Sequence, residues 1–103
     1  MVIETSSEYE NTRSNERYDL FVDVGETLTV ATTFLKPKQE TLGHSHPNVE
    51  NYYFHNDCIL KIGDDRYTIK APLKVHLPSN VFHQVINPYN NVVVFTCTYE
   101  TIT

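Results

Sequence analysis

Apolar and polar side chains alternate with a period of two along most of the chain, which is the pattern of half-buried β-strands. In residues 27–35, Leu28, Val30, Thr32 and Phe34 alternate with Thr27, Thr29, Ala31 and Thr33. Other runs rich in β-branched and aromatic residues predict strands at residues 20–24, 51–55, 58–62, 66–70, 74–77, 81–86 and 91–98. No stretch shows a helical period, and the runs are short and regularly spaced. We therefore expect an all-β sandwich or barrel.

Turn residues separate these runs. The sequence Gly63-Asp64-Asp65 predicts a tight hairpin between residues 58–62 and 66–70, because Gly and Asp accommodate the backbone of such turns. The first 17 residues differ from the rest, since they are rich in Ser, Asn and Glu and show no sustained period. We expect residues 1–17 to form either a flexible arm or a strand that adds to a partner's sheet. Residues 18–103 then form a single barrel domain.

Charge and composition exclude several classes of protein. The 103 residues include 8 Lys and Arg against 13 Asp and Glu, a formal net charge of −5. A nucleic-acid binder or a polybasic membrane anchor would need a basic face instead. No apolar run approaches the roughly 20 residues that span a bilayer. The two cysteines, Cys58 and Cys97, lie in apolar runs far apart, so we expect buried free thiols in a soluble, cytoplasmic protein.

The candidate chemical site consists of three histidines and one glutamate. His44 and His46 are two residues apart, so on an extended strand both imidazoles point to the same face. Glu50 follows after a bend at Pro47, and His83 lies on a later strand. Three imidazoles and one carboxylate suit a divalent first-row metal, and Fe, Mn, Co, Ni and Zn all accept such a set. Four protein ligands around an octahedral ion would leave two positions open for chemistry.

Two segments of the chain resemble the two motifs of the cupin family. Residues 37–57 (PKQETLGHSHPNVENYYFHND) are similar to the first motif, and residues 72–87 (PLKVHLPSNVFHQVIN) to the second. The resemblance matches His44, His46 and Glu50 to the first motif's metal ligands, and His83 and Asn87 to the second motif's ligand and terminal Asn. It implies a double-stranded β-helix, the cupin or jelly-roll barrel, with one divalent transition metal at its mouth.

The motifs depart from the family pattern in their loops. The family usually has Gly where Lys38, Asp57 and Pro72 stand, and Pro-x-Gly where this chain has Pro78-Ser79-Asn80. Asn and Asp tolerate the left-handed backbone conformation that such glycines adopt. We expect these changes to affect loop geometry and to leave the ligand set intact.

Strand parity predicts which other side chains line the barrel. Tyr52 and Phe54 share the parity of Glu50, and Val85 and Asn87 share that of His83. Tyr52 could therefore present a hydroxyl to a substrate, or simply pack in the core with its hydroxyl toward solvent. We expect the aromatic residues Phe34, Phe95 and Tyr99 to fill the barrel.

Two further histidines are less well determined by parity. His55 is expected to face away from the metal, as a surface or subunit contact. His76 precedes the turn at Pro78-Ser79-Asn80, so its parity cannot be related to that of His83. It is either an acid/base residue beside the metal or a polar side chain on the barrel wall.

Three functions are compatible with these residues. The one we favour is a metal-dependent isomerase or lyase acting on a small polar, sugar-like or carboxylate substrate, with Glu50, Tyr52 or His76 moving the proton. The alternatives are a non-haem iron dioxygenase and a non-catalytic domain that binds a small ligand. Because small cupins commonly pair through edge strands, the resemblance also implies a homodimer.

Overall fold

A computed structural model describes residues 13–101 and contains nine β-strands. The strands are β1 (Arg13–Ser14), β2 (Tyr18–Val24), β3 (Leu28–Leu35), β4 (Glu50–Phe54), β5 (Cys58–Ile62), β6 (Asp65–Ile69), β7 (Leu73–Leu77), β8 (His83–Ile86) and β9 (Val93–Glu100). The expected strands are all present, with ends that differ by one or two residues. The alternation of side chains therefore predicted the secondary structure of the described chain.

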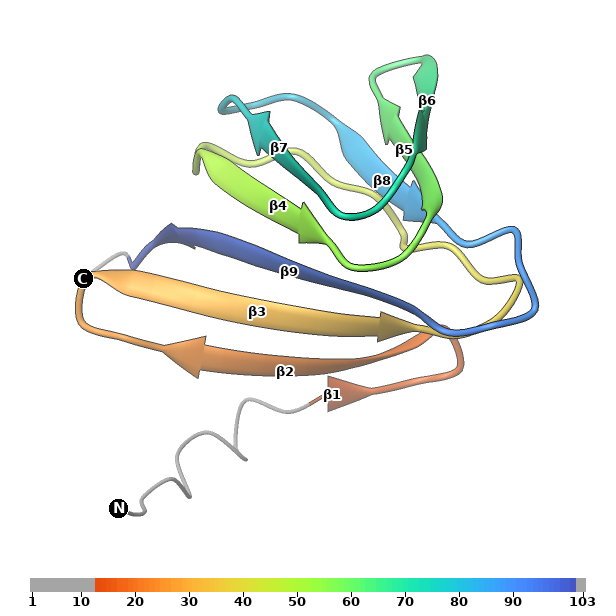
Figure 1. The fold of residues 1–103 in the computed structure, drawn as a ribbon. Coiled ribbons are helices and arrows are strands. Elements are labelled where there is room, and N and C mark those ends of the chain that lie inside the picture. Colours follow the sequence, from red (N-terminus) through yellow and green to blue (C-terminus); the bar gives the residue numbers. More distant parts are fainter. Residues whose placement is uncertain (1–12, 102–103) are drawn as a thin grey trace.

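The strands form two antiparallel sheets that face each other (Figure 1). The large sheet has the order β1-β2-β3-β9-β4-β7, and the small sheet has the order β6-β5-β8. In the large sheet β9 pairs with β3 along its whole length and with β4 on its other side, so strands distant in sequence are neighbours. This arrangement confirms the all-β prediction.

The hairpin between β5 and β6 closes with a two-residue turn. Ile62 pairs with Asp65, so the turn consists of Gly63 and Asp64 alone. Gly63 has a φ of 59°, whereas Asp64 has a negative φ, which is the combination of a type II′ turn. Asp65, which was expected in the turn, is the first residue of β6.

The core lies between the two sheets and follows the alternation of the strands. In β3 the buried residues are Thr29, Ala31, Thr33 and Leu35. The prediction that Phe34 fills the barrel was therefore wrong. Phe34 is on the outer face, 37% exposed, and meets the Phe21 ring edge to face at 5.6 Å. The sequence misled because, apart from Leu35, the larger and more apolar side chains of this strand point outward.

Asn87 is a buried polar residue that joins two loops. Its Nδ2 atom donates to the carbonyls of Leu35, Lys36 and Asn91 at 2.8–3.1 Å, and its Oδ1 atom accepts from the Tyr89 amide at 3.0 Å. The residue points inward, as its parity predicted, but it does not line the barrel cavity. It holds together the turns at the end of the barrel away from the cluster of histidines.

Two of the four loop departures adopt the left-handed backbone of the glycines they replace. Lys38 and Asn80 both have a φ of 62°, and they are the non-glycine residues with positive φ in the described chain. Asp57 has another role, since its Oδ1 atom accepts a hydrogen bond from the Ala71 amide at 2.9 Å. The loops therefore keep the expected path with different residues.

Residues 1–12 lie outside the described range. Within it, β1 pairs with β2 of the same chain, through Arg13 with Leu20 and Ser14 with Asp19. Whether residues 1–17 act as an arm or an exchanged strand depends on residues outside the described range, and the homodimer stays a prediction. Residues 13–101 contain no helix of the length and apolar character that crossing a membrane requires.

Candidate metal centre

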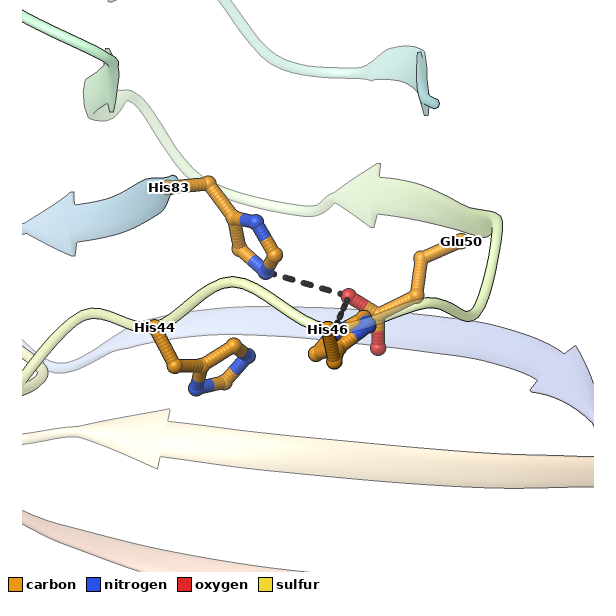
Figure 2. Close-up of side chains that lie close together, drawn as sticks. All are labelled: His44, His46, Glu50 and His83. Atoms are coloured by element: carbon orange, nitrogen blue, oxygen red, sulfur yellow. Dashed lines mark hydrogen bonds and ion pairs between the residues drawn. The ribbon is translucent and has the colours of Figure 1, made fainter. Parts of the chain in front are cut away.

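Three segments bring His44, His46, Glu50 and His83 together at one end of the barrel (Figure 2). Glu50 is the first residue of β4 in the large sheet, and His83 is the first residue of β8 in the small sheet. His44 and His46 lie on the segment before β4, which runs beside β8. One nitrogen or oxygen atom from each residue lies within 4.8 Å of the others.

Backbone hydrogen bonds attach this histidine-bearing segment to β8. The amide of His44 donates to the carbonyl of His83 at 3.1 Å, and the amide of His83 donates to the carbonyl of His44 at 2.9 Å. The amide of Asn80 donates to the carbonyl of His46 at 2.7 Å. Of His44 and His46, only His44 forms a β-bridge, with His83, so the two histidines do not lie on a regular strand. Both imidazoles nevertheless reach the cluster.

The carboxylate of Glu50 lies at the centre of the cluster. Its Oε1 atom is 3.0 Å from His46 Nε2 and 3.1 Å from His83 Nε2. Glu50 and His83 are only 4% and 3% exposed. Burial acts to raise the pKa of the Glu50 carboxyl, but the contact with His83 and the nearby His46 outweigh it and lower the pKa below its usual value.

The histidines have unequal environments. Burial, together with the neighbouring His83 and His46, lowers the pKa of His44. Burial also acts to lower the pKa of His83, but Glu50 and the Val81 carbonyl outweigh it and raise that pKa above 6.5. The cluster therefore combines a carboxylate that stays ionised with imidazoles of different basicity.

Two buried nitrogen atoms of the cluster indicate that it fits a cation. His83 Nδ1 donates to the Val81 carbonyl at 2.9 Å, so in the neutral ring Nε2 carries a lone pair. That lone pair faces Glu50 Oε1 at 3.1 Å, and Nε2 makes no hydrogen bond of acceptable geometry within residues 13–101. His46 Nδ1 is likewise buried without a hydrogen-bond partner in this part of the chain. His83 Nε2 and Glu50 Oε1, two electron-rich atoms 3.1 Å apart, require a proton or a metal ion between them.

The donor set and its spacing suit a divalent transition metal. Ligands at the usual 2.0–2.2 Å from one ion are about 3 to 4.3 Å apart, so the cluster needs only a small contraction to hold one. The His83 ring has the orientation common in metal sites, with its second nitrogen bound to a carbonyl. The chain therefore contains a possible metal site of three histidines and one glutamate.

The cluster lies between two hollows. An interior cavity of about 370 Å³ extends into the barrel and has His44, Glu50, Tyr52 and His83 in its wall. A second hollow of about 290 Å³, on the rim, is lined by His44, His46, Asn48, Glu50 and Tyr99. A metal in the cluster would thus be reachable from the rim and would also face the interior.

Tyr52 takes the interior position that parity predicted. Its ring is 4% exposed, lines the cavity and meets the His83 ring at 5.6 Å between centroids. Burial, with the nearby Cys97 and Glu50, raises the pKa of the phenol far above its usual value. Tyr52 is therefore a neutral hydroxyl beside the cluster.

The structure does not bring His76 to the cluster. His76 pairs with Asn51 across β4 and β7, and its Nδ1 atom lies 3.0 Å from Asn51 Oδ1. Asn51 points to the opposite face of the sheet from Glu50, because neighbouring residues of a strand alternate. We therefore do not propose an acid/base role for His76. His55 is also exposed and outward, with Nε2 3.1 Å from Thr96 Oγ1.

Comparison with solved structures identifies the fold. An RmlC-like cupin from Shewanella frigidimarina superposes with a TM-score of 0.75 and 13% identity, over 90% of this chain and 86% of that one. The cupin domain of Cnp3 from Schizosaccharomyces pombe gives a TM-score of 0.77 and 10% identity, over 89% and 69%. No protein-family model matches the chain, and no curated protein is similar to it in sequence.

An enzyme is also among the similar structures. Oxalate decarboxylase from Lactobacillus farciminis superposes with a TM-score of 0.79 and 15% identity, over 88% of this chain but only 31% of that one. At these identities the likeness concerns the fold. The chain therefore has the cupin jelly-roll fold that its two motifs implied.

Proposed function

We propose that the protein is a metal-dependent enzyme, an isomerase or lyase that moves a proton on a small oxygen-bearing substrate. The observation that supports this most directly is a shared cavity wall: three of the four cluster residues, His44, Glu50 and His83, line the same interior cavity as the Tyr52 ring. A divalent metal at the cluster would polarise the substrate oxygen atoms and acidify the adjoining C–H bond.

The residues of the chain have separate parts in this proposal. His44, His46, Glu50 and His83 hold the ion. Of the three residues considered for proton transfer, His76 faces outward. We propose that the ionised Glu50 carboxylate accepts the C–H proton and that the neutral Tyr52 hydroxyl donates a proton back to the substrate. The barrel walls around Tyr52 exclude bulk water and keep the donor oriented.

Metal content tests the first part of the proposal. The purified protein is expected to carry close to one equivalent of metal by elemental analysis, and the double variant His44→Ala/His83→Ala is expected to lose it. The matched control is His55→Ala/His76→Ala, which removes two histidines outside the cluster and should keep the metal. Failure of the parent to bind any of Fe, Mn, Co, Ni or Zn would overturn the metal-dependent function.

Proton exchange tests the second part. Small hydroxy ketones and hydroxy acids incubated with the loaded protein in D₂O should exchange their acidic C–H, as followed by proton NMR under strictly anaerobic conditions. Tyr52→Phe should slow this exchange by about 10²- to 10⁴-fold without loss of metal. The control is Tyr53→Phe, because Tyr53 points to the opposite face of β4. Turnover that requires dioxygen would instead support the dioxygenase alternative.

A further inference from the structure

The interior cavity behind the cluster is built from successive rows of inward-facing residues. In the register of the large sheet, Tyr52 lies beside Cys97, Cys97 beside Ala31 and Ala31 beside Val22. The next row, deeper in the barrel, contains Leu20, Thr33 and Phe95. Each of these residues lines the cavity.

Small side chains produce this hollow. Ala31 and Cys97 occupy adjacent positions in the row next to the cluster, where larger side chains would fill the barrel. The walls around them are mainly apolar, with Leu20, Val22 and Phe95 from the large sheet. Val85 closes the cavity from the small sheet. A molecule in the cavity would therefore contact mostly carbon atoms.

Outside the cluster, the polar side chains of the wall carry one amide and five hydroxyls spread through a mainly apolar surface, from Gln84, Tyr18, Thr33, Thr41, Tyr52 and Tyr99. Thr41 Oγ1 already accepts from the Val85 amide at 3.0 Å, and Gln84 Nε2 donates to the Thr41 carbonyl at 2.6 Å. Within residues 13–101, none of the side chains that line the cavity is a lysine or an arginine. A buried hydroxyl or charge without a partner costs about 1–3 kcal/mol or more. A sugar-like or multiply charged body is therefore a poor fit.

We propose that the substrate has two parts: one oxygen-bearing head at the cluster and a compact, uncharged, apolar body that fills the interior cavity. This inference rests on the proposed metal-dependent function and narrows its substrate class. It narrows the polar, sugar-like or carboxylate substrate expected from the sequence to a small molecule that carries its polar atoms at one end only.

A series of straight-chain hydroxamic acids tests this division. The hydroxamate group chelates a divalent metal through two oxygen atoms, and the alkyl chain lengthens from acetohydroxamate to octanohydroxamate with the head unchanged. Binding is measured by calorimetry on the zinc-loaded protein. Affinity should rise by about fourfold for each added methylene until the cavity is full, which is the usual gain for burying a CH₂ group.

A pair of probes of equal carbon number compares the two substrate classes directly. Hexanohydroxamate has an apolar body and gluconohydroxamate has a sugar-like one. The apolar probe should bind at least about tenfold more tightly, because most of the cavity wall is apolar and would leave several hydroxyls without a partner. Tighter binding of gluconohydroxamate would overturn the proposal.

Variants locate the alkyl chain. Ala31→Leu should end the rise in affinity at a shorter chain and leave acetohydroxamate binding unchanged, whereas Val22→Ala should extend the rise to a longer chain. Thr32→Leu is the matched control, because Thr32 points to the outer face, where its Oγ1 atom contacts Thr96 Oγ1 at 3.3 Å. Retained acetohydroxamate binding shows that each variant is folded and loaded.

The outcomes separate the two proposals. A protein that takes up no metal overturns the metal-dependent function, and the substrate inference with it. A loaded protein that binds acetohydroxamate with no gain on chain extension overturns the substrate inference alone. A rise that Ala31→Leu does not shorten and Val22→Ala does not extend also overturns it, since the chain would then lie outside the interior cavity.

Discussion

His44 and His83 are joined by a reciprocal pair of backbone hydrogen bonds, 3.1 Å and 2.9 Å long, while their imidazole rings lie 4.6 Å apart between centroids. The first residue belongs to the segment before β4 and the second begins β8. Their side chains therefore converge because the backbone places them together, before any ion binds. A site organised in this way loses less conformational entropy when it takes up a metal.

Gly43 is expected to be essential to this geometry. It has a φ of 83°, and a Cβ atom there would lie 2.6 Å from Phe82 Cζ. Gly43→Ala should lower the free energy of unfolding by about 1–3 kcal/mol through backbone strain and crowding, and should weaken metal binding because His44 is displaced. Urea titration and metal titration measure the two effects.

Gly63→Ala is the control for Gly43→Ala. Gly63 has a φ of 59°, but a Cβ atom there meets open space within the described chain. Gly63→Ala should lower the free energy of unfolding only by the cost of placing alanine in the left-handed backbone conformation, about 1 kcal/mol, and should leave metal affinity unchanged. Equal effects of both substitutions on metal binding would show that Gly43 has no special relation to His44.

Lys38 offers a site for stabilisation. It is a non-glycine residue with a φ of 62°, a conformation that costs an L-residue roughly 1 kcal/mol. Lys38→Gly should raise the free energy of unfolding by no more than about 0.5 kcal/mol in urea titration, because the greater entropy of unfolded glycine offsets about 0.5–1 kcal/mol of the relieved strain. Lys38→Ala keeps the strain and should give no gain. Asn80→Gly should give a smaller gain, because Asn tolerates this conformation.

Metal affinity should increase with pH. The pKa of His83 is raised above 6.5 in the metal-free protein, so on acidification its Nε2 atom takes up a proton earlier than an ordinary histidine and ceases to be a ligand. Glu50 has a lowered pKa and stays ionised over the same range. Calorimetry between about pH 6 and 8 should show affinity falling toward acid, by up to about tenfold per pH unit for each proton displaced. A flat profile would contradict a ligand role for His83.

The two thiols should react slowly in the folded protein. Burial, with Asp57 nearby, raises the pKa of Cys58 to about 12, and burial, with Glu50 nearby, raises that of Cys97 to about 12. The thiolate is the reactive form, so iodoacetamide near pH 8 should modify neither residue quickly, and urea should release both. Cys97→Ser assigns any residual reaction to one thiol. Rapid modification of the native protein would mean that the barrel opens readily.

Sequence reasoning selected the four residues that the structure brings together, because their chemistry and parity are local properties. Glu50 and Tyr52 lie two apart on one strand, and both point inward as alternation requires. For His76 the alternation of side chains could not be followed past the turn after β7, so its direction relative to His83 could not be predicted. Its outward direction follows from the pairing of His76 with Asn51, which no local pattern contains.

The interior cavity could not be predicted from the sequence either. Its wall joins Val22, Ala31 and Cys97, which are neighbours only through the pairing of β2, β3 and β9. The wrong prediction for Phe34 has the same cause. Hydrophobicity alone favoured it for the interior, whereas the register placed the smaller Thr33 and Leu35 there. Side-chain size at each depth, and therefore substrate shape, depends on long-range pairing.

The division of the cluster between two sheets has a mechanical consequence. Glu50 begins a strand of the large sheet and His83 begins a strand of the small sheet, and no strand pairs the two sheets within residues 13–101. An ion held by both residues would act as a removable cross-link across the barrel mouth. The cysteines cannot supply such a link, because both are free and buried. The stiffness of the mouth would then follow the supply of metal, tightening as the ion binds and relaxing when acid or a chelator removes it.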